Sequence, residues 1–330
     1  MRLFTCPECG STLAFDNLTC GCGAAVFFDP AGQWFLTRAF PCKNRVEIGC
    51  NWAAQPGEAL CHSCAMTEVI PDAFQNENRS LWAESERAKR WVLANLGRWG
   101  WFSPNDPGQK PVFHLMSEDT QAGEVEVIMG HELGVVTINV TEANPAESLH
   151  RRLELGESYR TMIGHYRHEL AHFLFERLKH FPDFPDQFRA MFGDERFDYA
   201  AALERYYRYG AFTGWDQTYV TPYASSHPHE DWAESASHLL HLTDITDSFA
   251  AAGLVSPSLP GAGYDPYAET DAGKLITIGI ELGIALNHVN RSMGINDIYP
   301  FVLTPAVRTK LMTIHRWLCV PLRGTLPQIR

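Results

Sequence analysis

The sequence contains no long hydrophobic run, no repeat of fixed period and no low-complexity tract. A membrane-spanning helix needs about 18 or more apolar residues with few charges, and no such stretch occurs. The opening residues, MRLFTCPECG, also contain no hydrophobic signal core before the first cysteines. We therefore expect a cytoplasmic protein with no membrane partner, and 330 residues are enough for two or three units around a sizeable core.

An excess of positive charge is also lacking. The formal net charge is -12 at pH 7, so the chain would on average repel phosphate backbones and anionic membrane surfaces. The first 64 residues carry four basic and five acidic side chains, which is no electrostatic footprint for nucleic acid. The charge therefore argues against a protein that coats nucleic acid, and a zinc-ribbon nucleic-acid binder is a disfavoured alternative.

Cysteine is nearly absent after residue 64, whereas eight of the nine cysteines lie in the first 64 residues. In a chain with no secretory signal, CxxC pairs are more typical of zinc ligands than of disulfides, because the cytosol keeps thiols reduced and zinc stabilises thiolates. Cys20-Gly21-Cys22 is tighter than a usual zinc knuckle, so the pairs could interleave. Two structural zinc sites are predicted, one at Cys6, Cys9, Cys20 and Cys22 and one at Cys42, Cys50, Cys61 and Cys64.

The metal in this region is interpreted first as a staple for a segment too small to hold itself together. Docking of a protein partner on the zinc ribbons is the alternative. Cys319, which stands alone, is predicted to be a buried apolar side chain.

Composition shifts predict an α+β protein in three parts. The polar segment after Cys64 indicates a boundary near residue 70, and apolar residues at helical spacing predict a helix over 80–96 that stops at Gly97. β-Branched runs over 111–140 predict a small antiparallel or mixed sheet, with a turn at 131–135. The parts are a double zinc-ribbon region (1–70), a helical linker (71–110) and a domain (111–330) with helices at 157–180, 197–208, 228–252, 270–293 and 305–320.

The segment YRHELAH places two histidines four residues apart. On a helix, His168 and His172 point the same way and can bind one zinc ion, and Glu169 lies about 100° round the helix, close enough to take a proton from a water on the metal. This is the machinery of metal-assisted hydrolysis. The setting supports it, because apolar side chains cover the other faces: Met162, Ile163, Tyr166, Leu170, Phe173, Leu174 and Leu178.

A third ligand must come from elsewhere in the chain. His165 stands about 10 Å along the axis from His172, so it is predicted to support the ligands or the core rather than to bind. Pro228 suits a first helical turn, which puts Glu230 in that turn as the candidate ligand. Glu234, one turn later, would hydrogen-bond a ligand histidine; the alternative is that both acids serve the helix N-terminus and solvent.

Further candidates surround this segment. Tyr223 is predicted to donate to the oxyanion that develops at the substrate carbonyl, with Tyr166 as the alternative. His227 and His229 are candidates for substrate binding, whereas His238 and His241 are predicted helix-face residues. Arg291 would receive a substrate carboxylate or, more simply, complement its helix C-terminus and pair with Asp297.

Four stretches together resemble a bacterial family of zinc-binding metallopeptidases with an N-terminal zinc-ribbon region: CNW and its cysteines (50–52, 61–64), YRTMIGHYRHELAH (159–172), HPHEDWAESASHLLH (227–241) and NRSMGINDIYPFVL (290–303). The resemblance implies a zincin-like, gluzincin-type fold with His168, His172 and Glu230 on zinc and Glu169 as the base. Separately, Tyr223-x6-Glu230-x2-Ala233-Glu234 is similar to the active-site segment of lethal factor-type zincins, which implies that the tyrosine assists the oxyanion.

The expected function is therefore a zinc-dependent endopeptidase or amidase acting on a peptide or protein, with one catalytic and two structural zinc ions. Residues 134–140 would form a sheet edge along which the peptide lies as an added strand. The alternative is a catalytically inert zinc-binding adaptor that binds a protein partner.

Overall fold

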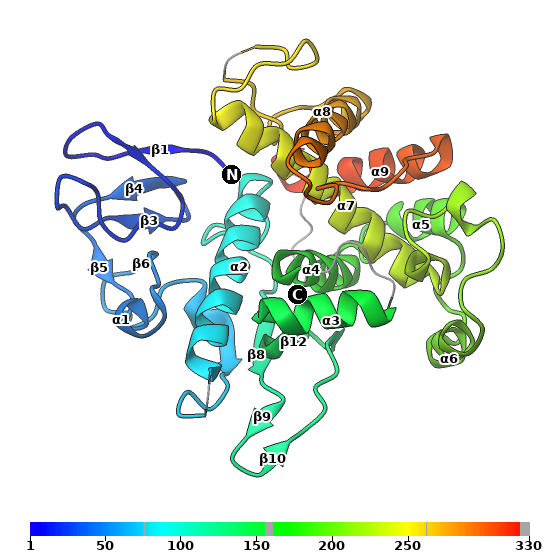
Figure 1. Ribbon diagram of the computed structural model, residues 1–330, viewed down its shortest axis with the longest axis horizontal. Helices are drawn as coiled ribbons and strands as arrows, with labels where there is room; N and C mark the ends of the chain where they lie inside the picture. Colours follow the sequence, from blue (N-terminus) through cyan, green and yellow to red (C-terminus); the bar gives the residue numbers. More distant parts are fainter. Residues whose placement is uncertain (76, 156–160, 262, 324–330) are drawn as a thin grey trace. The chain divides into compact units, whose positions relative to one another are not determined.

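The computed structural model describes residues 1–75, 77–155, 161–261 and 263–323 (Figure 1). The chain divides into two compact units, Met1–Leu170 and Ala171–Arg330. The division falls inside helix α4 (Met162–Leu178), which is continuous across it. The predicted boundaries near residues 70 and 110 stay predictions. Among the helices of the described ranges, none is long and apolar enough to cross a bilayer.

The first unit begins with short hairpins around an aromatic cluster. Strands of two or three residues bury too little surface to be stable alone. The rings of Phe4, Phe15, Phe28, Phe35 and Trp52 pack with neighbouring centroids 5.0–6.4 Å apart and supply the core. The elements here are β1 (Phe4–Thr5), β2 (Thr12–Leu13), β3 (Phe27–Asp29), β4 (Trp34–Leu36), β5 (Phe40–Pro41), α1 (Arg45–Ile48), β6 (Ala53–Ala54) and the 3-10 turn η1 (Cys64–Met66).

Helix α2 (Asn78–Arg98) confirms the helix predicted over residues 80–96. The predicted stop at Gly97 is wrong, because Gly97 is helical and the chain first takes a positive φ at Gly100, at +96°. The buried side of α2 includes three of the residues whose spacing predicted it: Ala88, Val92 and Leu96.

A four-stranded sheet in the order β11-β12-β8-β7 completes the first unit. β12 and β7 each pair with β8 in parallel, and β11 pairs with β12 in antiparallel fashion. The sheet is therefore mixed, one of the two forms predicted, and the purely antiparallel form is wrong. The chain leaves β8, makes a separate hairpin of β9 and β10, returns to the sheet as β11, and then turns into β12, which runs in the same direction as β8 (Figure 1). The bounds are β7 (Thr67–Val69), β8 (Val112–Met116), β9 (Asp119–Thr120), β10 (Gly123–Glu124), β11 (Gly130–Glu132), β12 (Val135–Asn139) and the 3-10 turn η2 (Val140–Ala143).

Strand β12 lies inside this sheet. Its backbone is paired with β8 on one side and β11 on the other. The prediction that residues 134–140 form a free edge for a substrate strand is therefore wrong for Val135–Thr137, because both sides of the strand are already paired there. The predicted turn is present at Leu133-Gly134, where φ is +49° and +88° and β11 reverses into β12.

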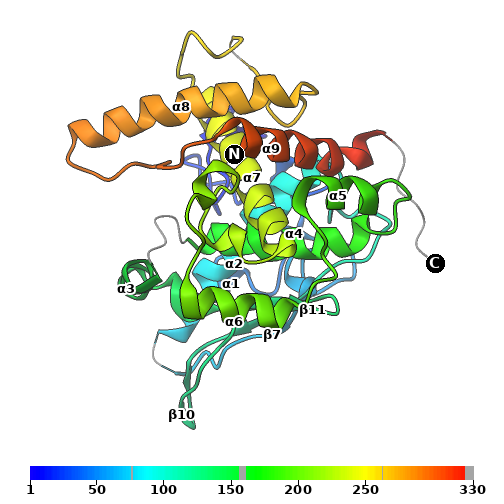
Figure 2. The ribbon, with the colours of Figure 1, turned by 90° about the vertical axis from the view of Figure 1, so that its right-hand side faces the viewer.

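Helix α7 (Pro228–Ala251) is the central element of the second unit and packs against α5, α8 and α9 (Figure 2). A Cβ on Gly279 of α8 would lie 2.9 Å from Cβ of Leu242, so only glycine permits this close approach of α7 and α8. The other elements are α5 (Phe184–Phe192), α6 (Tyr199–Tyr209), α8 (Ala272–Ser292), α9 (Pro305–Leu318) and the 3-10 turns η3 (Trp215–Gln217), η4 (Tyr223–Ser225) and η5 (Val320–Arg323).

The predicted helices agree with α4, α6, α7, α8 and α9, although residues 157–160 of the first lie outside the described ranges. In the described part of the chain three α-helices were missed: α1, α5 and α3 (Pro145–Leu155). The last two share a feature. Both contain proline in the first turn, Pro145 and Pro185, where its missing N–H leaves no hydrogen bond unmade.

Candidate metal centre

The eight N-terminal cysteines gather in the two predicted groups of four, each with its sulfur atoms within 4.8 Å of one another. Sγ of Cys50 lies 3.6 Å from Sγ of Cys61 and 3.7 Å from Sγ of Cys64. In the other group Cys9 and Cys20 are 3.5 Å apart. A disulfide requires about 2.05 Å. Four thiolates around one zinc ion, each at about 2.3 Å, would be separated by about 3.8 Å. The spacing fits a shared metal and not a disulfide.

The second cysteine group is buried and receives backbone hydrogen bonds at two of its sulfur atoms. Cys42, Cys50, Cys61 and Cys64 are all buried. Hydrogen bonds from the Cys50, Cys61 and Cys64 thiols hold the pKa of Cys42 well below its usual range, whereas burial raises the pKa of Cys61 and hydrogen bonds with the neighbouring sulfurs raise that of Cys64. The backbone N–H of Cys61 donates to Cys42 Sγ over 3.3 Å, and that of Cys64 donates to Cys61 Sγ over 3.4 Å. Such donors stabilise thiolates, the form that binds zinc.

A third group combines α4 with α7. His168 and His172 follow one another by one turn on α4, and Glu230 lies in the first turn of α7. The ligand atoms of the three residues lie within 4.8 Å of one another. Nε2 of His172 and Oε1 of Glu230 are 3.4 Å apart. Two ligands about 2.0–2.1 Å from a tetrahedral zinc ion would be about 3.4 Å apart. The donor set and its spacing therefore fit zinc.

Trp232 fixes Glu230 against α4. Its indole nitrogen donates to the carbonyl oxygen of Ala171 over 2.9 Å, one residue before His172. The indole is 1% exposed and packs on Phe184 and Phe188 of α5. Glu230, two residues before Trp232, is thereby held under cover with 1% of its surface exposed. Proline in the first turn of α7 and the cap at His227 start the helix at this point.

Glu169 is the carboxylate next to the histidine pair. It is 8% exposed, and its Oε2 is buried and accepts no hydrogen bond from any residue that the structure describes. An unsatisfied buried acceptor costs about 1–3 kcal/mol. Such an oxygen suits a group that takes up a proton from water or from a substrate. The orphaned atom fits the predicted role of Glu169 as a base.

The two candidate tyrosines differ in their surroundings. Tyr166 is fully buried and its hydroxyl is 2.8 Å from the Ser85 hydroxyl of α2. Tyr223 lies in η4, directly before α7. Burial and, after it, the charge of Glu230 raise the pKa of Tyr223 well above its usual value. Its hydroxyl therefore keeps its proton at neutral pH and can act as a donor.

Sequence reasoning missed Tyr199. Its hydroxyl donates to Oε1 of Glu230 over 2.7 Å, although 31 residues separate the two. The only local signal is Asp198, whose side chain accepts from the N–H of Ala201 and caps α6. A capping residue predicts where a helix begins, but it does not predict which distant residue the first side chain of that helix contacts.

Two of the predicted supporting residues have defined partners. Nε2 of His165 is 2.8 Å from Oε2 of Glu142, which also pairs with Arg151. Glu234 accepts from the Thr221 hydroxyl over 2.7 Å. The predicted roles of His165 and Glu234 around the ligand histidines stay predictions.

The substrate-binding candidates are held by the protein itself. Nδ1 of His227 accepts from the N–H of His229, so Nε2 carries the proton and donates to Phe197 O over 3.1 Å. Burial, then the nearby His172 and His227, lowers the pKa of His229 to about 4. Arg291 pairs with both carboxylate oxygens of Asp297 at 2.7 and 2.5 Å, the simpler of its two predicted roles.

The remaining candidates lie farther along α7 and α9. Nδ1 of His238 is 2.8 Å from the Tyr299 hydroxyl, and His241 stacks on the same ring. Cys319 is buried, as predicted, with its sulfur 3.6 Å from Nε2 of His315.

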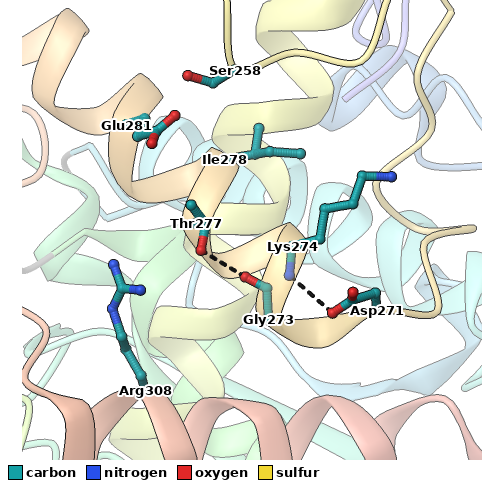
Figure 3. A pocket seen from close by; sticks show the side chains of 8 residues that line it. All are labelled: Ser258, Asp271, Gly273, Lys274, Thr277, Ile278, Glu281 and Arg308. Atoms are coloured by element: carbon teal, nitrogen blue, oxygen red, sulfur yellow. Dashed lines mark hydrogen bonds between the residues drawn. The ribbon is translucent and has the colours of Figure 1, made fainter.

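A shallow cavity of about 530 Å³ lies between α8, α9 and the chain before α8. Figure 3 shows Lys274 and Arg308 on different sides of it, with Asp271 bonded to the backbone N–H of Lys274. None of its lining residues belongs to the three groups of metal donors. The cavity is therefore not part of the candidate metal centre.

Comparison with known proteins also indicates zinc binding. Residues 78–317 match the model of a family described as putative zinc-binding metallo-peptidase. An uncharacterized protein of Mycobacterium bovis is 36% identical over 336 residues, covering 96% of this chain and 94% of the relative. Uncharacterized proteins from two strains of Mycobacterium tuberculosis match with the same identity and coverage. No solved structure matches the chain significantly. The family match includes His168, His172 and Glu230 and begins after the cysteines.

Proposed function

The chain belongs to the family of putative zinc-binding metallo-peptidases, as its motifs predicted, and we propose that it hydrolyses peptide bonds with zinc held by His168, His172 and Glu230. The observation that carries the proposal is the 3.4 Å separation of His172 Nε2 and Glu230 Oε1, the spacing of adjacent ligands on a tetrahedral ion. The same proposal assigns the α+β catalytic domain to the zincin-like folds of gluzincin type.

A bound zinc ion would supply Lewis acidity, which polarises a carbonyl and lowers the pKa of a water molecule toward neutrality. Glu169 accepts the proton that the attacking water gives up and returns it to the leaving amine. Its buried Oε2, which no described residue satisfies, is the atom suited to this transfer. Tyr223 keeps its phenolic proton and donates it as a hydrogen bond to the oxygen on which negative charge develops.

The two cysteine groups would each hold a structural zinc ion. Their sulfur spacings and, in the buried group, the N–H donors to sulfur support thiolate ligation. Each ion would stabilise hairpins that are too short to bury a large hydrophobic core. The purified full-length chain should therefore contain three zinc ions, two in tetrathiolate sites and one at the histidine pair.

The test replaces one carboxylate oxygen by an amide. Glu169→Gln should retain all three zinc ions and lose about 10²–10⁴-fold in the rate of peptide hydrolysis. Glu176→Gln is the matched control, because Glu176 is two turns later on α4 and half-exposed beside Lys179. Zinc is counted by mass spectrometry and cleavage is followed on a diverse peptide library. If the wild-type protein contains three zinc ions but cleaves no peptide, this proposal is wrong and the inert adaptor is favoured.

A further inference from the structure

Tyr199 and Glu230 form a contact that the proposed mechanism does not use. Oη of Tyr199 is 2.7 Å from Oε1 of Glu230, and the same oxygen is 3.4 Å from Nε2 of His172. A carboxylate oxygen has two lone-pair directions. One can be directed to a metal ion while the other accepts the phenolic hydrogen.

We infer that Tyr199 is a positioning residue that holds the Glu230 carboxylate in its metal-binding orientation through this hydrogen bond. The inference rests on the proposed zinc site. Side chains that hydrogen-bond a metal ligand orient it before the metal arrives, and their loss costs about 10–100-fold in metal affinity. The phenol also stabilises Glu230 as a carboxylate, since that side chain is 1% exposed and has little contact with water.

The position of the Tyr199 hydroxyl is set by the start of α6. Tyr199 is the first residue of that helix, directly after the Asp198 cap. Its ring makes an edge contact with His227, whose Nε2 donates to the carbonyl of Phe197. His227 thus connects the residues before α6 with the first turn of α7. This arrangement fixes the phenol beside Glu230 although α6 has no buried residue of its own.

The test is a single-atom deletion with a matched control. Tyr199→Phe removes the hydroxyl and keeps the ring that packs on His227. Tyr209→Phe removes the same group from the far end of α6, where the side chain is 74% exposed. The full-length proteins are titrated with dipicolinate, and the zinc released is counted with an optical indicator. His172→Ala, which lacks one proposed ligand, identifies the step that belongs to this site.

Tyr199→Phe should release that zinc at a chelator concentration at least tenfold lower than wild type. Tyr209→Phe should match wild type, and the thermal midpoint of the chelator-treated proteins should be equal. At saturating zinc, the turnover number of Tyr199→Phe should return near the wild-type value, because the phenol acts through Glu230 and not on the substrate. An affinity of Tyr199→Phe within twofold of wild type would overturn the inference and leave the proposed function intact. If the wild-type protein lacks this zinc ion, both the inference and the proposed function are wrong.

Discussion

The indole nitrogen of Trp232 donates to the carbonyl oxygen of Ala171 over 2.9 Å. This bond joins the N-terminal part of α7 to the middle of α4, one residue from His172 and two from Glu230. Those two side chains come within 3.4 Å of each other at the same level. The proposed metal centre therefore depends on a tertiary hydrogen bond that is not itself part of the donor set.

Trp232→Phe should weaken zinc binding at the His168, His172 and Glu230 site and destabilise the fold by about 1–3 kcal/mol, because a hydrogen bond and ring volume are both lost. The control is Trp317→Phe. Trp317 packs on Phe184 as Trp232 does, but its indole nitrogen has no hydrogen-bond partner in the described chain. Trp317→Phe should lower the stability of the fold and leave zinc binding at this site unchanged. Urea unfolding and dipicolinate titration measure the two effects, and equal zinc loss in both variants would contradict this account.

Tyr223→Phe should lower the turnover number by about 10²–10³-fold with little change in KM or zinc content, because the phenol would act only on the charge that develops in the transition state. Tyr166→Phe should keep the turnover number and lose stability instead, since the Tyr166 hydroxyl is bonded to Ser85. Steady-state kinetics on a cleaved peptide decides between them. A loss of turnover in Tyr166→Phe alone would transfer the role to Tyr166.

Lys310→Met should destabilise the protein by about 3–5 kcal/mol, because it leaves the Asp231 carboxylate buried without its cation. Nζ of Lys310 is 2.6 Å from Oδ2 of Asp231, and both side chains are almost fully buried. Lys274→Met is the control, since Lys274 is half-exposed in its pair with Glu269 and should contribute less than about 1 kcal/mol. Denaturant unfolding at neutral pH measures both. The double variant Asp231→Asn, Lys310→Met should recover part of the loss, and no recovery would argue that packing of Lys310 dominates.

Cys42→Ser and Cys22→Ser should each reduce bound zinc by one ion, but with different consequences for stability. Cys42 is buried among three other buried sulfurs, whereas Cys22 is exposed. Loss of the buried site leaves thiol groups without compensation inside the fold, so Cys42→Ser should lower the thermal midpoint further. Zinc content and thermal unfolding are measured on the same samples. Unchanged zinc in either variant would mean that the affected group of four is not a metal site.

Local pattern was enough to predict several parts of this protein. The four-residue spacing of His168 and His172 places both on one helix face, because the helical repeat is 3.6 residues. Pro228 and the acids after it located the start of α7. The clustering of cysteines predicted two groups of four donors, which the chain brings together as predicted. The first two depend on residues within a turn or two of one another, where backbone geometry determines which side chains are neighbours. The cysteines of one group are farther apart, as Cys42 and Cys61 are, and their grouping was predicted from the chemistry that they share.

Local pattern was not enough to predict the helices that contain proline in their first turn or the pairing of the strands. The helices α3 and α5 were missed, and each has a proline in its first turn, a residue that can either end a helix or begin one. The sheet became mixed, with β12 inside it, because strand direction depends on the path of the chain between β8 and β12.

The sequence by itself therefore predicted the candidate donors: two histidines one helical turn apart, an acid at a helix start, and two sets of thiols. Only the tertiary structure decided that Tyr199, 31 residues before Glu230, bonds to that acid, and that Trp232 bonds to Ala171, 61 residues away. The physical reason is the range of the forces that leave a pattern in sequence. Helical periodicity and capping act within a turn or two, whereas contacts between distant segments arise when complementary surfaces are buried together.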